Sequence, residues 1–175
     1  ELDEKDAEGR FSEEDDAPLK IAIVGRPNVG KSSLLNQLAG DARAIVCDYS
    51  GTTRDTIDSD VTGADGNKYT LIDTAGSRRR TAVAAGRDVP ESLAVGRALQ
   101  AMRRADIVVL VVDAEEGPSQ QDFVLAERAA TQEGCGLVLC VNKWDLIDKD
   151  SYSMNEYTKT LRSKLRVFEW ASVVY

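Results

Sequence analysis

Apolar residues from position 19 onward fall into two kinds of segment that alternate along the chain. Short and almost continuous apolar runs, typical of strands buried on both faces, occur at Lys20–Val24, Asp106–Val112 and Leu137–Val141. Segments with apolar residues at helical spacing predict helices at Lys31–Ala39, Glu91–Arg104, Ser119–Glu133 and Met154–Arg166. Strands that alternate with helices in this way indicate an α/β fold with a mostly parallel sheet.

Three further segments bring the predicted sheet to six strands. Lys68–Thr74 reads as a strand, and Ile57–Thr62 is its expected hairpin partner across the polar turn at residues 64–67. Trp170–Tyr175 begins the last strand, and Ser119 is expected to cap the helix that it starts. In such sheets ligands bind at the carboxyl ends of the strands, so the residues after each strand are the candidates for chemistry.

The residues after the first strand read GRPNVGKSS and match the phosphate-loop pattern G-x-x-x-x-G-K-S. In this pattern the glycines let backbone N–H groups turn toward phosphates, and the following helix adds its positive end. Lys31 supplies a charge to the outer phosphates, and Ser32 offers a hydroxyl to Mg²⁺. The predicted phosphate-binding residues are Gly25, Asn28, Val29, Gly30, Lys31, Ser32 and Ser33.

The tetrapeptide NKWD, Asn142 to Asp145, directly follows the strand Leu137–Val141 and indicates which base is bound. A carboxylate at Asp145 can accept hydrogen bonds from both the ring N–H and the exocyclic amine of guanine, whereas adenine lacks this donor pair. Two charge-assisted hydrogen bonds of about 1.5–3 kcal/mol each would discriminate by about two to four orders of magnitude. Together with the phosphate loop, Asn142, Lys143 and Asp145 favour GTP and GDP as ligands.

The tetrapeptide DTAG, Asp73 to Gly76, closes the strand that starts at Lys68. Asp73 can hold Mg²⁺ through water, and the N–H of Gly76 can sense a terminal phosphate. An ordinary turn after a strand is the alternative interpretation. The other two motifs disfavour it, because they predict an acid at this strand end.

Taken together, GRPNVGKSS, GTTRD (Gly51–Asp55), DTAG and NKWD resemble Era-like P-loop GTPases over residues 19–175. The run IDTAGSRRR is similar to the second GTPase domain of the Der (EngA) family, whose chains carry two such domains in tandem. The resemblance implies a Ras-like fold and slow GTP hydrolysis, with Lys31, Thr53 and Gly76 at the terminal phosphate. It also implies Mg²⁺ held by Ser32, Thr53 and Asp73, and a role in assembly of the large ribosomal subunit.

A potassium ion is implied by the same resemblance. In similar GTPases an asparagine at the position of Asn28 helps to hold K⁺ beside the phosphates, and here the backbone around Cys47, Tyr49 and Thr52 would complete the site. A fixed cation can sit where other GTPases insert an arginine finger, a contribution of about 10³–10⁵ in rate. The alternative is that Asn28 only caps or orders the loop.

The segment after DTAG departs from the family pattern. Ser77 stands where Ras-like enzymes have a glutamine and members of the Der family have an apolar residue. The serine side chain is too short to position the attacking water, so the sequence does not identify the residue that does so. The extension Ser77–Pro90 resembles those of plastid members and begins with a basic tip. Arg78, Arg79 and Arg80 form the tip, and Arg97, Arg103 and Arg104 would continue it as a basic patch. One interpretation is that these arginines are simply solvated. The other is that they contact ribosomal RNA or a neighbouring GTPase domain of a longer chain.

The acidity of the chain is confined to one end. The net charge is −8, and residues 1–17 hold nine acids against two bases, which leaves the rest nearly neutral. We expect residues 1–17 to be a disordered linker and residues 18–175 to be the GTPase domain, without its last guanine-binding loop and final helix. Three cysteines without metal-ligand spacing indicate reduced thiols, and no apolar run is long enough to span a membrane.

The resemblance places the protein in the cytoplasm if it is bacterial, or in the chloroplast stroma if it is of the plastid type. Two alternative functions stay open. One is a nucleotide-sensing module that scarcely hydrolyses GTP, which the short side chain of Ser77 favours. The other is a different potassium-dependent Era-like GTPase, acting in RNA modification or iron transport.

Overall fold

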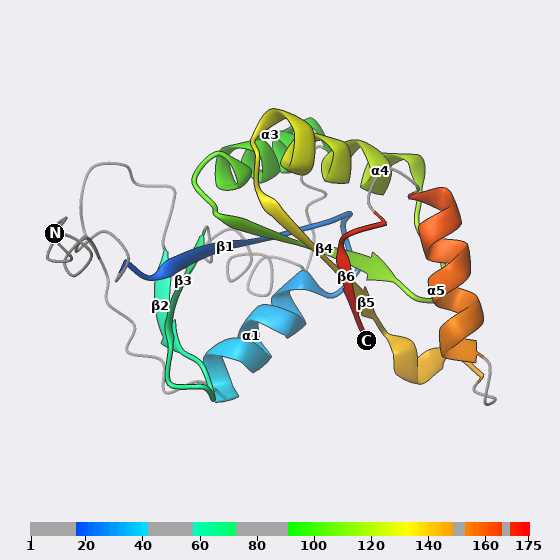
Figure 1. Cartoon of the computed structure of the whole chain (residues 1–175), viewed down its shortest axis with the longest axis horizontal. Coiled ribbons are helices and arrows are strands. Elements are labelled where there is room, and N and C mark those ends of the chain that lie inside the picture. The colour runs from blue at the N-terminus through cyan, green and yellow to red at the C-terminus, as the bar shows by residue number, and fades with distance from the viewer. Residues whose placement is uncertain (1–16, 42–57, 73–90, 149–152, 166–168) are drawn as a thin grey trace, which may run out of the picture.

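The computed structural model describes residues 17–41, 58–72, 91–148, 153–165 and 169–175 (Figure 1). Within them, six strands form one sheet in the order β2-β3-β1-β4-β5-β6. The strands are β1 (Leu19–Val24), β2 (Ser59–Thr62), β3 (Lys68–Ile72), β4 (Ile107–Asp113), β5 (Gly136–Asn142) and β6 (Ser172–Val174). Each pair of neighbours is parallel except the hairpin β2–β3, so the predicted, mostly parallel six-stranded sheet is confirmed.

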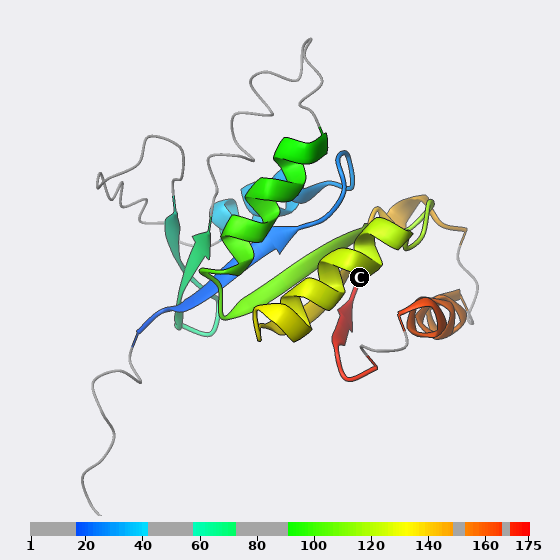
Figure 2. The ribbon, with the colours of Figure 1, turned by 90° about the horizontal axis from the view of Figure 1, so that it is seen from above.

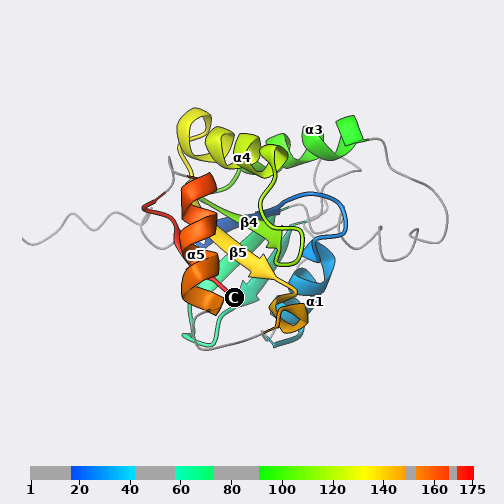
Figure 3. The same ribbon diagram turned by 90° about the vertical axis from the view of Figure 1, so that its right-hand side faces the viewer.

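Helices cover both faces of this sheet. They are α1 (Lys31–Asp41), α3 (Glu91–Met102), α4 (Gln120–Glu127) with the π-helical turn η2 (Arg128–Gln132), the 3-10 turn η3 (Trp144–Leu146) and α5 (Ser153–Lys164). Helix α1 lies on one side of the sheet, and α3 and α4 lie on the other (Figures 1 and 2). Figure 3 shows α5 at the end of the sheet formed by β5 and β6.

The core sits mainly between the sheet and the helices α3, α4 and α5. Strand β4 occupies the middle of the sheet, where Val108 and Leu110 to Val112 are fully buried. Leu125 of α4 and Leu161 of α5 belong to the same buried cluster as Leu110. A fully buried central strand explains why β4 is the longest continuous apolar run in the sequence.

Helix α4 begins with the predicted cap. The Ser119 hydroxyl accepts from the backbone N–H of Asp122, and the Asp122 carboxylate accepts from the backbone N–H of Ser119, which together form a capping box. The helix predicted to continue to Glu133 changes at Arg128 into the π-helical turn η2. Helical periodicity cannot distinguish these two windings over so few residues.

Two of the three cysteines lie in the part of the chain that the structure describes. Cys135 and Cys140 are buried and form no disulfide, and burial raises the pKa of both thiols. Cys47 lies outside the described residues. Among the helices that the structure describes, none has the length and apolar character needed to cross a membrane.

Candidate nucleotide-binding site

The phosphate loop, residues Gly25 to Ser33, leaves the carboxyl end of β1 and runs into α1. Gly25 and Gly30 have φ angles of +146° and +97°, and Asn28 lies in the left-handed region at +65°. A Cβ added to Gly25 would lie 2.5 Å from the carbonyl oxygen of Val111, so only glycine fits against β4 there. This sequence of backbone conformations turns the loop in the tight path that phosphate loops require.

The phosphate loop and the base motif NKWD are in direct contact. The side-chain amide of Asn142 donates a hydrogen bond of 2.8 Å to the carbonyl of Val29, which is itself buried. A Cβ on Gly30 would come within 2.0 Å of the same Asn142 nitrogen. Gly30 is therefore required for two reasons: its positive φ and the close approach of Asn142.

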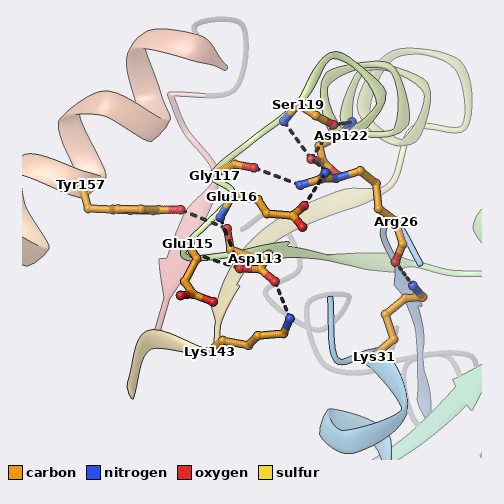
Figure 4. Close-up of polar contacts among 10 residues, drawn as sticks. All are labelled: Arg26, Lys31, Asp113, Glu115, Glu116, Gly117, Ser119, Asp122, Lys143 and Tyr157. Carbon is orange, nitrogen blue, oxygen red and sulfur yellow. Dashed lines mark hydrogen bonds and ion pairs between the residues drawn. The ribbon is translucent and has the colours of Figure 1, made fainter. Parts of the chain in front are cut away.

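The loop lysine is held back onto its own loop. The ammonium group of Lys31 donates to the backbone carbonyl of Arg26 (Figure 4). Lys31 also begins α1, and the amide of Leu34 donates to the carbonyl of Gly30 in the first helical turn. The lysine charge and the N-terminal end of the helix thus act on the same loop, an arrangement that favours an anion.

The second residue of the base motif is tied to the neighbouring strand. Lys143 has a left-handed backbone at φ +63°, and its ammonium lies 2.5 Å from Oδ2 of Asp113 (Figure 4). The other carboxylate oxygen of Asp113 accepts from the backbone N–H groups of Glu115 at 2.9 Å and Glu116 at 3.4 Å. Asp113 ends β4 and is almost fully buried, whereas the Lys143 side chain is about one-third exposed.

This pairing shifts both ionisable groups toward their charged forms. Burial acts to raise the pKa of Asp113, but the hydrogen bonds from Lys143 and the backbone of Glu115 and Glu116 outweigh it, so the pKa falls below its ordinary value. The hydrogen bond to Asp113 raises the pKa of Lys143. The pair is therefore ionised across the neutral range, with Lys143 held in one position beside the base motif.

Aromatic rings from α5 and from the residue after β6 support the base motif. Trp144 packs edge-to-face against Tyr157 and Tyr175, with ring centroids 5.2 Å and 4.6 Å apart. The Tyr157 hydroxyl donates to the carbonyl of Asp113 at 3.4 Å, and burial raises the pKa of Tyr157 to about 12. Asp145, the predicted guanine acceptor, lies in η3 with its side chain exposed.

The structure thus brings the phosphate-binding and base-binding residues of the predicted site together. The phosphate-loop residues and the motif from Asn142 to Asp145 meet at the carboxyl ends of β1 and β5, as the rule for parallel sheets predicts. The remaining predicted ligands of Mg²⁺, K⁺ and the terminal phosphate lie outside the described residues; they are Cys47, Tyr49, Thr52, Thr53, Asp73 and Gly76. Ser77 and its extension lie outside as well. Among the described residues there is no cluster of His, Cys, Asp or Glu able to hold a metal.

Sequence reasoning missed three residues that the structure places at this site: Arg26, Asp113 and Tyr157. Asp113 carried a signal, because it ends a strand at the same sheet edge as the motifs. Arg26 occupies a variable position of the phosphate-loop pattern, and Tyr157 lies on a helix distant in sequence.

The arginines of the predicted basic patch are partly paired with acids. Arg103 lies 3.5 Å from a carboxylate oxygen of Glu133, and Arg104 forms an ion pair with Asp58. Residues 78–80, the tip of the patch, lie outside the described residues. Exposed ion pairs of this kind contribute little stability.

The described residues fit a nucleotide's phosphates. Gly25 and Gly30 leave no room for a side chain. Lys31 is the first residue of α1, and its ammonium contacts the same loop. Ser32, the predicted Mg²⁺ ligand of this loop, stands in the first turn of that helix.

Comparison with known proteins agrees with this geometry. The family described as 50S ribosome-binding GTPase matches residues 20–143. A protein of Nostoc punctiforme named GTPase Der is 51% identical over 157 residues, which cover 90% of this chain and 33% of that protein. Aquifex aeolicus Era bound to GDP·AlF4⁻ has a TM-score of 0.61 and 25% identity, covering 89% of this chain and 49% of that one. A structure of Era with MgGDPNP and part of 16S ribosomal RNA has the same TM-score, identity and coverage.

The fold and the family match define a Ras-like P-loop GTPase domain of the Era-like type. The chain belongs to the 50S ribosome-binding GTPase family, a family of GTP-hydrolysing enzymes, and shares about half of its aligned residues with proteins named GTPase Der. It spans about a third of the length of those relatives.

Proposed function

We propose that this domain binds GTP and GDP across the phosphate loop and the base motif, and hydrolyses GTP by in-line attack of water. The observation that carries the proposal is the hydrogen bond from Asn142 to Val29, because it joins the two halves of the site. A nucleotide spans these halves, with its phosphates at one and its base at the other.

Each described residue has a defined task in this proposal. Lys31 and the backbone of the phosphate loop stabilise the negative charge that develops on the terminal phosphate, and Ser32 holds the magnesium ion. Asp145 selects guanine through its two hydrogen bonds, while Asp113 orients Lys143 beside the base. When bound, Mg²⁺ neutralises charge on the outer phosphates. Thr53, Asp73 and Gly76 are assigned to the metal and the terminal phosphate by resemblance.

The potassium site forms a separate part of the proposal. Asn28 lies at the turn of the phosphate loop, where a left-handed backbone is well suited to asparagine. We assign its side chain to a potassium ion, with backbone groups around Cys47, Tyr49 and Thr52 as further ligands. The same backbone geometry would serve an asparagine that only orders the loop, so the ion has to be tested directly.

We further propose that the output of the switch is assembly of the large ribosomal subunit, with ribosomal RNA as a partner. The family is described as 50S ribosome-binding, and the related Era binds a fragment of 16S ribosomal RNA. A neighbouring GTPase domain in a longer chain is a second proposed partner, since the relatives are about three times as long. Either the bacterial cytoplasm or the chloroplast stroma would suit this task.

The first experiment is GTP hydrolysis by the purified chain in potassium and in sodium at equal ionic strength, with ATP as the control nucleotide. We expect turnover of GTP but not ATP, and a higher rate in potassium that is lost in Asn28→Ala. Equal rates in both salts would remove the potassium assignment. Tight GTP binding without turnover would instead support the nucleotide-sensing alternative, and absence of binding would refute the proposed function for this chain.

A further inference from the structure

The side chain of Arg26 leaves the phosphate loop and reaches the segment that leads into α4 (Figure 4). Its Nε donates to Oδ2 of Asp122 at 3.0 Å, one terminal nitrogen donates to Glu116 at 2.8 Å, and the other donates to the carbonyl of Gly117 at 3.0 Å. All three nitrogens of the guanidinium are thus engaged by residues 116–122, about ninety positions away in the sequence. Such a fork of donors fixes position and orientation together.

The acceptor at the centre of this contact is fully buried. Asp122 has no exposed side-chain surface, and its Oδ2 also accepts from the backbone N–H and the hydroxyl of Ser119, each at 2.9 Å. Its Oδ1 is buried and has no hydrogen-bond partner among the described residues. A buried carboxylate is costly without an opposite charge, and Arg26 is the cation that compensates it.

Arg26 also sets the position of the loop lysine. Its carbonyl accepts the hydrogen bond from the ammonium of Lys31, so the residue that the α4 segment holds by its side chain holds Lys31 by its backbone. The loop is then fixed at three points: Gly25 against the backbone of Val111, Arg26 on the α4 segment, and Val29 under Asn142.

We propose that Arg26 is a positioning residue for the phosphate loop, acting through its clamp on Glu116, Gly117 and Asp122. This inference rests on the proposed nucleotide-binding function and deepens it. The clamp pre-orders the loop and the Lys31 ammonium for the outer phosphates, and it does not touch the base motif. Loss of the clamp therefore weakens binding of ligands that carry outer phosphates, and spares the contribution of the base.

The test compares nucleotides that differ only in phosphate number. Affinities of GTP, GDP and GMP are measured by displacement of a fluorescent GDP from the purified chain, for the wild type and Arg26→Gln. We expect Arg26→Gln to weaken GTP and GDP about tenfold and to leave GMP unchanged, because GMP lacks the outer phosphates. Equal losses for all three nucleotides, as expected of a general loss of folded protein, would overturn the inference. Unchanged affinity for GDP would overturn it as well.

Three further variants make the test independent of folding. Arg26→Lys keeps the charge beside Asp122 but loses the fork, so a partial recovery of GDP affinity is expected. Glu116→Gln removes the charge of an acceptor whose side chain is 64% exposed. Like Arg26→Gln, it should lower the affinity for GDP, and it should do so without unfolding the chain. Arg128→Gln changes an arginine at the other end of the same helix and should match the wild type. Wild-type affinity in both Arg26→Lys and Glu116→Gln would refute the clamp.

A second measurement does not depend on nucleotide binding. Hydrogen–deuterium exchange of the nucleotide-free chain should show faster exchange of the loop amides at residues 28–31 in Arg26→Lys, with unchanged exchange in β5. If the wild type binds none of the nucleotides, the proposed function fails, and this measurement still decides the clamp. Unchanged exchange in the loop would overturn it.

Discussion

The side-chain amide of Asn142 lies 2.8 Å from the carbonyl oxygen of Val29, so the predicted base-binding motif supports the predicted phosphate-binding loop. The two residues are 113 positions apart: Asn142 ends β5, whereas Val29 lies in the loop between β1 and α1. Occupancy at one half of the site is therefore expected to depend on the geometry of the other half.

Replacement of Asn142 by aspartate tests this dependence. The new carboxylate cannot donate to the Val29 carbonyl and would face it with negative charge, at a cost of about 1–3 kcal/mol. We expect Asn142→Asp to lower both the free energy of unfolding in urea and the affinity for GDP. Asn155→Asp makes the same change at an exposed position of α5 and serves as the control. Equal behaviour of the two variants would contradict the coupling.

Comparison of Gly30→Ala with Gly66→Ala separates the effect of a steric clash from that of backbone strain. Gly66 also has a positive φ, at +82°, but a Cβ there meets nothing within 4 Å, so Gly66→Ala should cost only about 1–2 kcal/mol of strain. Gly30→Ala should cost more, because its Cβ also collides with Asn142. Urea unfolding of Gly30→Ala, Asn142→Ala and the double variant would show less than additive losses, since the second change removes the colliding amide.

Asp113 should make stability depend on pH in the acidic range. Its pKa in the folded protein lies below the ordinary value of 3.8, so its stabilising effect is fully present above that value and is lost as the pH falls through the folded pKa. Asp113→Asn is expected to lower the free energy of unfolding at pH 7, and this deficit should shrink as the pH falls below 3.8. Asp148→Asn, at an exposed position, is the matched control in urea titrations at several pH values. A deficit that persists undiminished at pH 3 would exclude the ion pair as its cause.

Asp145→Asn should change which base is accepted. An asparagine presents one donor and one acceptor, which suits the carbonyl that xanthine carries in place of the exocyclic amine of guanine. We expect GTP affinity to fall by at least tenfold and XTP affinity to rise, as measured by competition for the same site. Asp148→Asn again serves as the control for a lost exposed charge. Parallel loss of both nucleotides would show that Asp145 supports the fold instead of reading the base.

The features that could be predicted from the sequence are those set by local pattern. The apolar run of β4 and the Ser119 cap each depend on a few neighbouring residues, and both are confirmed. The motif positions at strand ends followed from the rule for parallel sheets. The family match was likewise expected from the four motifs.

Contacts between distant segments could not be predicted in this way. The pair of Arg26 and Asp122 joins residues 96 positions apart, and nothing in either local pattern marks the other. Asp113 and Lys143 meet because β4 and β5 are neighbours in register, with Asp113 opposite Asn142. That register depends on packing of the whole sheet, which hydrophobic periodicity does not specify.

The ring cluster behind the base motif has a practical consequence. The chain contains two tryptophans; Trp144 lies within the motif between Tyr157 and Tyr175, and Trp170 is 59% exposed. A Trp170→Phe variant would keep Trp144 as its single tryptophan, one residue before Asp145, the proposed guanine-binding acid. Its intrinsic fluorescence would then provide a label-free optical signal of nucleotide exchange, readable by stopped flow without any dye attached to protein or ligand.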